Sequence, residues 1–551
     1  MQMPKRLLVA FVAITGSLAA QTPTITGIVN GASAIPPGLP NYAIAEGSIF
    51  VVYGSNLGAP PPAGVVVNPA PLPLPVGNFA GTSVTVAVNG TTLPVPIQYT
   101  SPGQLAGIMP SATPAGSGTL TVTYAGKSVS SPVTVLVSAF GISNLRVPSG
   151  HETAAVAFGT NENEVVSVLD AAAPGDVLVL LGTGLGPSIG DIDTNYPIQG
   201  NLGTAPIVYV GEVPSPNVSY YGRTPIYPGL DEIIFTVPMN APLGCHVSII
   251  VQTANLGVPI VSNVPNTAIA ATDHTPCTDP VNGFPAAALA DPASSNNFVV
   301  SLIENQSFLP STPGGTIPSK PVIADTYQIL APQFTPFELF AVSLTLAEAS
   351  QGTCEAGFAP NVATPATPPP ATYLNIGNPL TLTPPSGSPI VLPAALPGIF
   401  VGADSLGIAP GTWTLATPGG ANEGPLNLNF KIPQPVTWTN QASLTGATIN
   451  RANGLTLTWS GGDGVNGFVD IQGFAANTTG TFLIGYDCSA PISAGSFTVP
   501  PAVLLRMPTG VGANATLQLS TYAYPSTISP IQGFNDGNFS QIQTIIPIVY
   551  Q

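Results

Sequence analysis

Proline and glycine interrupt this sequence throughout, while charged residues are scarce, and the combination limits what the chain can fold into. Among 551 residues there are 64 prolines and 59 glycines, but only 9 basic and 25 acidic side chains. So few charges cannot supply the polar faces of a coiled coil or a long exposed helix. Hydrophobic residues make up 44% of the chain, enough apolar surface to argue against disorder. The sequence therefore predicts an all-β protein rich in turns.

Residues 1–20 have the features of a secretory signal. Lys5 and Arg6 precede the short apolar run Leu7–Ile14, and the small residues suited to signal cleavage follow at Ser17–Ala19. No later run approaches the 18 apolar residues of a membrane helix. We expect an exported chain, secreted or held at the cell surface, with no transmembrane segment once the signal is removed.

The charge of the exported chain excludes one class of partner. Removing the signal leaves 7 basic and 25 acidic residues, a net charge of −18. So few cations cannot neutralise a run of phosphates, and nucleic-acid binding is excluded.

Two stretches of the first half resemble each other at an offset of 128 residues. Residues 46–58 read EGSIFVVYGSNLG, and residues 174–186 read PGDVLVLLGTGLG. Each combines a short apolar strand with a glycine-containing turn. The repeat predicts two domains, over residues 21–142 and 143–278.

Alternating apolar and polar residues predict further strands around these stretches. Residues 84–88 alternate and end at Asn89-Gly90, which favours a tight hairpin turn because both residues tolerate positive φ. Residues 119–124 and 246–251 alternate in the same way. Short strands at this spacing predict β-sandwiches.

Four segments resemble a known bacterial domain: NGAS (30–33), EGSIFVVYGSNLG, YTSPGQLAGIMP (99–110) and YGRTPIYPGLDEIIFTVP (221–238). They are similar to the immunoglobulin-like domain of the IPT/TIG type, which is repeated in many secreted proteins of soil bacteria. The resemblance spans roughly residues 24–272. It implies tandem immunoglobulin-like sandwiches in an extracellular setting and brings no agreed catalytic residues. The first copy carries Ala106-Gly107 where the family has a polar-apolar strand, so a weaker strand is expected there.

The second half of the sequence has a different distribution of proline and glycine. Proline-rich stretches at 309–320 and 360–372 are typical of linkers or long loops. Alternation resumes at 455–459, and the tryptophan-containing segments here resemble C-terminal β-modules that accompany such repeats. We expect a third β-rich module at 279–432 and a fourth sandwich at 433–551.

Four cysteines in an exported chain favour disulfide bonds, with three connectivities to choose from. A Cys245–Cys277 bond would staple the end of the second domain, and Cys354–Cys488 then follows by elimination and would tie the third module to the fourth. Free buried thiols or a zinc site are the alternatives. Zinc is disfavoured because the sequence has no CxxC or Cys/His cluster.

The sequence offers no convincing catalytic motif. Ser405 stands in an A-x-S-x-G variant of the nucleophile elbow, but no histidine follows His274. His151 begins a zincin-like motif that lacks its second histidine. The glycines of 182–186 have the wrong spacing for a dinucleotide loop, and a strand-to-turn junction explains them better. We expect a non-enzymatic protein.

One loop has the alternating oxygen ligands of a calcium site, at Asp191, Asp193 and Asn195. Tyr196 and Leu202 stand where an EF-hand needs Gly and Glu, which leaves either a looser calcium site or a solvated loop. No other cofactor is expected.

Aromatic residues provide the candidate contact patch. Trp459 alternates with leucines and is assigned to a core in preference to a sugar platform. Tyr220, Tyr221 and Tyr227 are placed with Arg223 on a Pro/Gly-rich loop, where sandwiches keep binding residues. The alternative is that the tyrosines pack within the loop itself.

These observations favour an extracellular, non-catalytic protein that binds or adheres to an extracellular polysaccharide or protein. Two alternatives stay open. One is a carbohydrate-active enzyme or its carbohydrate-binding accessory, with a pair of carboxylates that the sequence does not reveal. The other is a structural spacer or fibre subunit.

Overall fold

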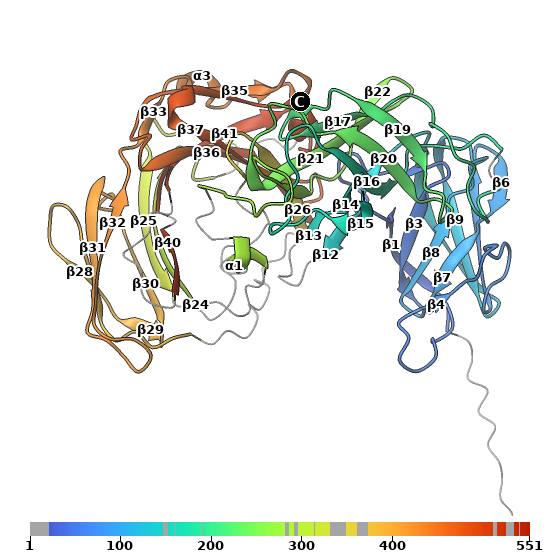
Figure 1. Cartoon of the computed structure of the whole chain (residues 1–551), viewed down its shortest axis with the longest axis horizontal. Coiled ribbons are helices and arrows are strands. Elements are labelled where there is room, and N and C mark those ends of the chain that lie inside the picture. Colours follow the sequence, from blue (N-terminus) through green and yellow to red (C-terminus); the bar gives the residue numbers. More distant parts are fainter. Residues whose placement is uncertain are drawn as a thin grey trace, which may run out of the picture.

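The computed structural model describes residues 21–146, 152–159, 161–190, 192–281, 286–290, 296–312, 315–330, 349–360, 373–510, 515–524, 534–538 and 540–551. The predicted signal, residues 1–20, lies outside this part, as do His151 and Asp191. Nearly all regular structure is β-strand, which confirms the all-β prediction (Figure 1). No helix in the described ranges is long and apolar enough to cross a membrane.

The first sandwich pairs two five-stranded sheets. One sheet has the order β1 (Thr24–Asn30), β3 (Ile49–Ser55), β8 (Gln104–Ile108), β7 (Ile97–Thr100), β4 (Asn68–Pro69). The other has the order β2 (Ile44–Ala45), β10 (Lys127–Leu136), β9 (Gly116–Tyr124), β5 (Thr82–Val88), β6 (Thr91–Pro94). Val84, Val86 and Val88 point into the core between the sheets, and the Asn89-Gly90 turn has the predicted positive φ values of 49° and 80°.

The strand expected to be weak, β8, forms and pairs on both sides. A Cβ atom at Gly107 would lie 2.7 Å from the Val95 side chain and 2.8 Å from the Pro96 carbonyl oxygen. The glycine therefore permits a close approach between neighbouring segments.

The second sandwich has a six-stranded and a seven-stranded sheet. The six-stranded sheet has the order β15 (Asn161–Val165), β14 (Val156–Phe158), β16 (Val177–Thr183), β20 (Asp231–Thr236), β19 (Val218–Arg223), with β11 (Gly141–Ile142) on β16. The other has the order β12 (Asn144–Arg146), β13 (Glu152–Ala154), β23 (Asn266–Ile269), β21 (Gly244–Asn255), β17 (Ile207–Val210), β18 (Val213–Pro214), with β22 (Val258–Val261) on β21.

The sequence repeat corresponds to a repeated strand register. In the first sandwich β3 lies between β1 and β8, and in the second β16 lies between β14 and β20. Val52 pairs with Leu105 in the first, and Leu180 pairs with Ile233 in the second, each residue displaced by 128 positions. The offset in the sequence thus marks two copies of the same antiparallel ladder.

The second half is built on one eleven-stranded sheet. Its order is β26 (Cys354–Pro360), β37 (Phe482–Pro491), β36 (Gly467–Ala476), β39 (Ala515–Ala523), β41 (Gln541–Tyr550), β24 (Asn296–Ser307), β25 (Val322–Leu330), β30 (Ile399–Asp404), β29 (Ala394–Leu396), with β34 (Thr448–Ile449) on β41 and β40 (Phe534–Asn538) on β24. Two smaller sheets pack against it. The four-stranded one is β28 (Ile390–Leu392), β27 (Leu380–Thr383), β31 (Gly411–Thr417), β32 (Leu426–Ile432), and the three-stranded one is β33 (Val436–Trp438), β35 (Leu455–Gly461), β38 (Ser496–Val499).

Helical segments in the described residues are short. They are α1 (Ala286–Ala290), α3 (Gln441–Leu444), α4 (Pro501–Leu504) and the 3-10 turns η2 (Arg451–Asn453) and η3 (Ile492–Ala494).

The predicted third and fourth modules share the large sheet. One core lies between β24, β25 and β30 and the four-stranded sheet, and a second lies between β36, β37, β39 and β41 and the three-stranded sheet. The predicted boundary at 432/433 separates the two small sheets, but backbone hydrogen bonds between β24 and β41 join the two halves of the large one. The two cores are therefore not independent units strung on a linker.

The second sandwich also packs on the fourth. Ile250, Val261 and Val264 belong to the same buried cluster as the core of the fourth sandwich, and Val264 forms a β-bridge with Ala356 of β26. In Figure 1 the green strands of the second sandwich accordingly lie beside the red strands of the fourth.

Both predicted disulfides are present. Cys245 at the start of β21 is bonded to Cys277 beyond the second sandwich, and Cys354 of β26 is bonded to Cys488, its directly opposite partner on β37. The second bond joins residues of the predicted third and fourth modules, as expected.

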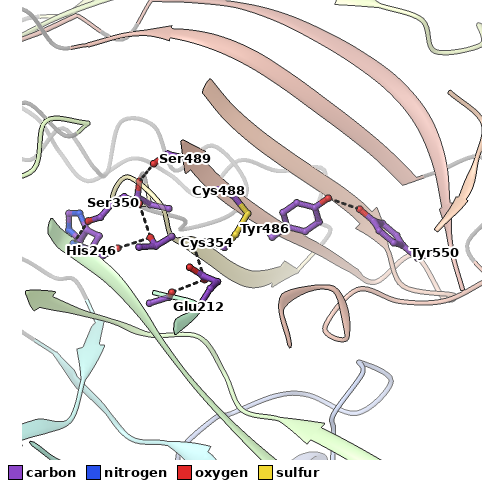
Figure 2. The surroundings of a disulfide bond; sticks show 11 residues. Glu212, His246, Ser350, Cys354, Tyr486, Cys488, Ser489 and Tyr550 are labelled. Atoms are coloured by element: carbon purple, nitrogen blue, oxygen red, sulfur yellow. Dashed lines mark hydrogen bonds between the residues drawn. A yellow bond between two sulfur atoms is a disulfide. The ribbon is translucent and has the colours of Figure 1, made fainter. Parts of the chain in front are cut away.

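A buried carboxyl group lies beside the second disulfide. Figure 2 shows Glu212, from the turn between β17 and β18, next to Cys354. Its Oε1 accepts hydrogen bonds from the Cys354 backbone N–H (3.0 Å) and the Ser248 hydroxyl (2.9 Å), whereas Oε2 has no hydrogen-bond partner. Glu212 as a residue is half-buried, but burial of its carboxyl group raises the pKa to about 8.

This carboxyl group should make stability depend on pH. The folded chain favours protonated Glu212, so the contribution is fully present below the unfolded pKa of 4.5 and is lost as pH rises through about 8. We expect the melting temperature of the wild type to fall from pH 5 to pH 9, and to fall less in Glu212→Gln, whose side chain cannot ionise. Thermal unfolding of both proteins at the two pH values measures the difference. Equal pH dependence in the two proteins would contradict the assignment.

Candidate functional site

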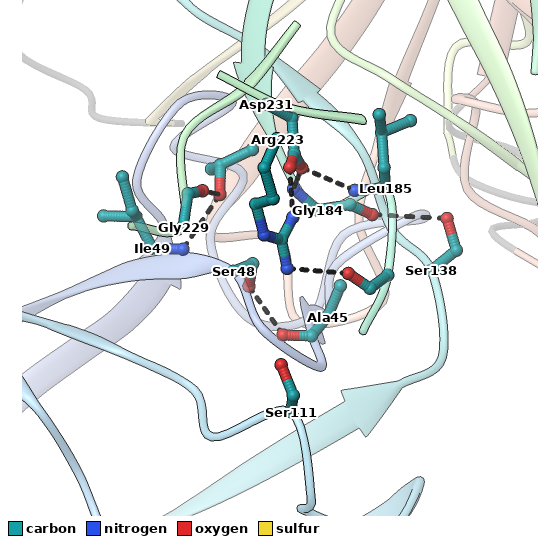
Figure 3. A network of polar contacts seen from close by, with 12 residues as sticks. Ala45, Ser48, Ile49, Ser111, Ser138, Gly184, Leu185, Arg223, Gly229 and Asp231 are labelled. Atoms are coloured by element: carbon teal, nitrogen blue, oxygen red, sulfur yellow. Dashed lines mark hydrogen bonds and ion pairs between the residues drawn. The ribbon is translucent and has the colours of Figure 1, made fainter. Parts of the chain in front are cut away.

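A buried ion pair anchors the junction between the first and second sandwiches. Arg223 of β19 and Asp231 of β20 face each other in register, form an ion pair and are both fully buried (Figure 3). Arg223 Nη2 also donates to the Gly186 carbonyl (2.8 Å), and Asp231 Oδ2 accepts from the backbone N–H groups of Gly184 (2.7 Å) and Leu185 (2.8 Å). The pair therefore holds the turn that follows β16.

That turn requires glycine at two places. Gly184 and Gly186 have φ values of 112° and 131°, which side-chain-bearing residues rarely adopt. A Cβ atom at Gly184 would lie 2.3 Å from the Ala139 carbonyl oxygen. The glycines predicted to form a strand-to-turn junction thus allow the turn to lie against the segment that links the two sandwiches.

Thr183 connects the sandwiches directly. Its hydroxyl accepts from the Ile49 backbone N–H (2.8 Å) and donates to the Gly229 carbonyl (2.6 Å), while its own carbonyl accepts from the Asn30 side chain (3.1 Å). The bonds from Ile49 and Asn30 join residues more than 130 positions apart. They restrict movement of the second sandwich against the first.

The loop between β16 and β17 starts at this turn and is tied to the first sandwich further along. Both carboxylate oxygens of Asp193 accept hydrogen bonds from Ser111, one from its backbone N–H and one from its hydroxyl, each 2.7 Å long. The Thr194 carbonyl accepts from the Leu74 N–H (2.6 Å). At the far end, Leu202 is buried in the core of the second sandwich. The loop is therefore fixed at its start, middle and end.

Between these anchors the loop exposes large apolar side chains. The exposed fractions are 98% for Ile189, 65% for Ile192, 67% for Tyr196 and 51% for Ile198. Single exposed apolar residues are ordinary, but a concentration within ten residues on a fixed loop is typical of interaction sites. We call these four residues the apolar loop surface.

The predicted contact patch is partly corrected. Tyr220, Tyr221 and Arg223 lie on strand β19 and not on a loop, and Arg223 cannot contact a ligand because its guanidinium is buried against Asp231. The prediction of a loop was wrong because a β-strand that contains Gly222 and has prolines on both sides resembles a loop in sequence. Tyr227 does lie on the connection between β19 and β20, where it is half-buried.

Tyr220 and Tyr221 of β19 form hydrogen bonds with the C-terminal part of the loop that carries the apolar loop surface. The Tyr220 hydroxyl donates to the Arg223 carbonyl (2.7 Å) and accepts from the Gly200 N–H (3.4 Å). The Tyr221 backbone N–H donates to the Asn201 side-chain oxygen (3.0 Å), and the Tyr221 carbonyl accepts from the Leu202 N–H (2.9 Å). They hold the C-terminal part of the loop against the sheet.

The predicted calcium residues serve other contacts. Asp193 binds Ser111, and the Asn195 side-chain oxygen accepts from the N–H of Tyr196 (2.9 Å). Asp191 lies outside the described residues. A calcium site in this loop stays a prediction, while Asp193 has a clear role in joining the loop to the first sandwich.

Three carboxylates that sequence reasoning missed form a row across the third sandwich. Glu304, Asp325 and Asp404 are directly opposite one another on β24, β25 and β30. Successive amides of the following loop bind one carboxylate each: Leu406 N–H donates to Asp404 (3.0 Å), Gly407 N–H to Asp325 (2.7 Å) and Ile408 N–H to Glu304 (2.6 Å). Burial, together with the negative neighbours Glu304 and Asp404, raises the pKa of Asp325 to about 6.

Two of the three carboxylates, Glu304 and Asp325, are buried, and Asp404 is half-buried. Glu304 and Asp325 are 6% and 1% exposed, so neither is open to a polymer substrate. Ser405 lies in the loop that follows β30, whereas Ala403 and Asp404 of the same A-x-S-x-G segment belong to the strand. Only register in the folded sheet brings these three acids together, because they are spread over a hundred residues of sequence.

The tryptophans are all in cores. Trp413, Trp438 and Trp459 are 2%, 8% and 4% exposed, and the Trp459 indole N–H donates to the Ile492 carbonyl (2.8 Å). The core assignment of Trp459 is confirmed.

Breaking the buried ion pair should cost much more than breaking a surface one. In Arg223→Ala the Asp231 carboxylate would be buried without its cation, and we expect the second sandwich to lose about 3–5 kcal/mol of unfolding free energy. The control is Lys431→Ala, which removes an exposed pair with Asp463 (3.3 Å) and should cost less than about 1 kcal/mol. Denaturant unfolding compares the variants, and similar losses in both would show that the junction does not depend on the pair.

No protein-family model matches this chain, and no curated protein is similar to it. Among solved structures, immunoglobulin domains 1–4 of Sidekick-1 align over 96% of this chain and 99% of that one, at 10% identity and a TM-score of 0.12. The ectodomain of mouse nectin-like molecule 4 aligns over 71% of this chain and 95% of its own, at 10% identity and a TM-score of 0.15. Titin domains A168–A170 align over 75% and 94%, at 10% identity and a TM-score of 0.13. The TM-scores are too low to show a shared superfamily, and the sheets described above show an all-β chain whose first half forms two tandem sandwiches.

Proposed function

We propose that this chain is an extracellular, non-catalytic binding protein whose apolar loop surface contacts a protein partner. The two disulfides support an oxidising compartment, because such bonds persist mainly in exported proteins. The repeated register and the sequence resemblance support assigning the first two sandwiches to the IPT/TIG type, in a chain exported by its first 20 residues.

The observation that carries the proposal is the exposure of four large apolar side chains on an anchored loop. Ordering a mobile loop on binding costs free energy, and a loop already fixed in place avoids much of this cost. Hydrogen bonds to Ser111 and Leu74 fix the middle of this loop, and the turn held by Asp231 fixes its start. The apolar loop surface is thus presented in one conformation.

The chemistry of the surface favours a protein over a polysaccharide. Three of its four residues are isoleucines, whose aliphatic side chains match apolar pockets of proteins better than the polar faces of sugars. Sugar-binding sandwiches stack rings on exposed aromatic side chains; all three tryptophans of this chain are buried, and Tyr196 is the single aromatic residue of the apolar loop surface. A polysaccharide ligand is therefore the second choice.

The remaining alternatives have less support. A carbohydrate-active enzyme needs two accessible carboxyl groups, and the row of Glu304, Asp325 and Asp404 is bound by the amides of the loop above it. A purely structural spacer would have no need to expose isoleucines on a fixed loop. Both alternatives remain outcomes of the experiment below.

Removing apolar area from the loop should weaken partner binding. Burying each isoleucine contributes about 1.5–3 kcal/mol, so Ile189→Ser with Ile192→Ser should weaken binding at least about tenfold. The immobilised chain is incubated with the surface and secreted proteins of the producing cells, and captured proteins are identified and titrated against both forms.

Val465→Ser is the matched control, because Val465 is 85% exposed and lies in the fourth sandwich, away from the loop. The proposal predicts a partner retained by the wild type and the control but lost by the loop variant. Equal retention by all three proteins would exclude the loop. Retention on an insoluble polysaccharide, or sugar release from it, would favour the carbohydrate alternatives, and no retention of any kind would favour a spacer.

A further inference from the structure

Three potential metal ligands from distant parts of the sequence meet at the rim of the second sandwich. Glu164 lies on β15, Asp170 on the turn after it, and His274 on the segment that follows β23. His274 Nδ1 is 2.9 Å from Asp170 Oδ1 and 3.6 Å from Glu164 Oε1. In the described part of the chain, no other group of three His, Cys, Asp or Glu residues brings its ligand atoms within 4.8 Å of one another.

Backbone hydrogen bonds fix these segments relative to one another. The His274 N–H donates to the Ala171 carbonyl (3.0 Å), and the Ala171 N–H donates to the Thr275 carbonyl (3.0 Å). Two residues further on, the Cys277 N–H donates to the Val168 carbonyl (2.9 Å). The segment carrying His274 is therefore paired with the turn carrying Asp170.

The imidazole is held in orientation by a residue outside the cluster. The His274 ring stacks on Phe158, with ring centroids 4.2 Å apart and an interplanar angle of 29°. Phe158 itself is buried in the core of the second sandwich. The ring therefore presents Nδ1 to the two carboxylates from a fixed support.

The spacing of the three atoms suits a small divalent ion. Zinc binds imidazole nitrogen and carboxylate oxygen at about 2.0–2.2 Å, which places neighbouring ligands of a tetrahedral site about 3.3–3.5 Å apart. The two measured distances lie on either side of that spacing. An ion could enter between the atoms with shifts of a few tenths of an ångström.

We propose that Glu164, Asp170 and His274 form a binding site for a divalent transition metal of the zinc class. One nitrogen and two oxygen ligands suit such ions better than calcium or magnesium, which prefer oxygen ligands alone. The side chains of His274, Glu164 and Asp170 are 43%, 40% and 32% exposed, so a water molecule can complete the coordination. The sequence has no zinc motif because more than a hundred residues separate His274 from the other two ligands.

Metal binding must displace a proton. The hydrogen bond to Asp170 raises the pKa of His274, with further contributions from the nearby charges of Asp170, Glu164 and Asp273. To accept the metal, Nδ1 gives up its proton to solvent and Nε2 keeps its own, which leaves a neutral imidazole.

A metal ion at this site would act as a second cross-link near the Cys245–Cys277 disulfide. Cys277, three residues after His274, is bonded to Cys245 of β21, which ties the same segment to the opposite sheet. A metal ion would tie that segment to β15 at the edge of the six-stranded sheet as well. Metal binding should thus stabilise the end of the second sandwich.

The test uses the full exported chain, dialysed against a chelator and titrated with Zn²⁺ by calorimetry. We expect one ion per chain and a rise in melting temperature. His274→Gln and Asp170→Asn should each weaken Zn²⁺ binding by more than about 100-fold, since changes beyond the ligands themselves already cost 10–100-fold.

Asp273→Asn is the matched control, because Asp273 lies next to His274 in sequence but is not a member of the ligand set. It should retain Zn²⁺ binding within about tenfold. Melting temperatures in chelator show whether each variant is folded. Zn²⁺ binding that is absent, that is unchanged in both ligand variants, or that Ca²⁺ displaces at equal concentration would overturn the proposal. None of these outcomes bears on the apolar loop surface, so the two proposals can fail separately.

Discussion

The buried pair of Arg223 and Asp231 is the interaction on which the arrangement of the first half depends. Burying two charges is costly, and the cost is offset only where geometry and additional hydrogen bonds satisfy both groups. Here the carboxylate binds two backbone amides of the turn after β16, and the guanidinium binds the Gly186 carbonyl. A structure in which that turn moved away would leave the buried pair without these additional hydrogen bonds, so the pair defines where the following loop begins.

The position of the apolar loop surface follows from the buried pair of Arg223 and Asp231. The turn directs the chain towards the first sandwich, where Ser111 binds Asp193 and holds the middle of the loop. The same turn lies against the segment that links the two sandwiches. The hydrogen bond from the Ile49 N–H to the Thr183 hydroxyl joins the sandwiches a second time. The junction between the two sandwiches and the loop after β16 therefore belong to one network of polar contacts. This network keeps the apolar loop surface in a single conformation, and the exposed isoleucines themselves do not contribute to it.

Much of the architecture was predictable from local patterns, and the failures have a common cause. Period-two alternation identified β5, β9, β21 and β35, and the four cysteines paired as their positions suggested. Alternation reports which face of a strand is buried but not which strand lies beside it. The shared eleven-stranded sheet, the acidic row of the third sandwich and the meeting of Glu164 with His274 all depend on strand neighbours distant in sequence. The placement of Arg223 on an exposed loop failed because glycine and proline mark a turn more often than they mark the end of a strand.

By itself the sequence determined the class of fold and the tandem repeat, and it predicted the disulfide pairs that the structure contains. These follow from composition, spacing and periodicity, which are properties of short stretches of chain. Tertiary structure alone decided that Arg223 is a buried structural residue, that the last two cores share a sheet, and that the exposed isoleucines stand on an anchored loop. The physical reason is that burial and strand pairing depend on which segments approach one another in the folded chain, and no local pattern encodes that approach.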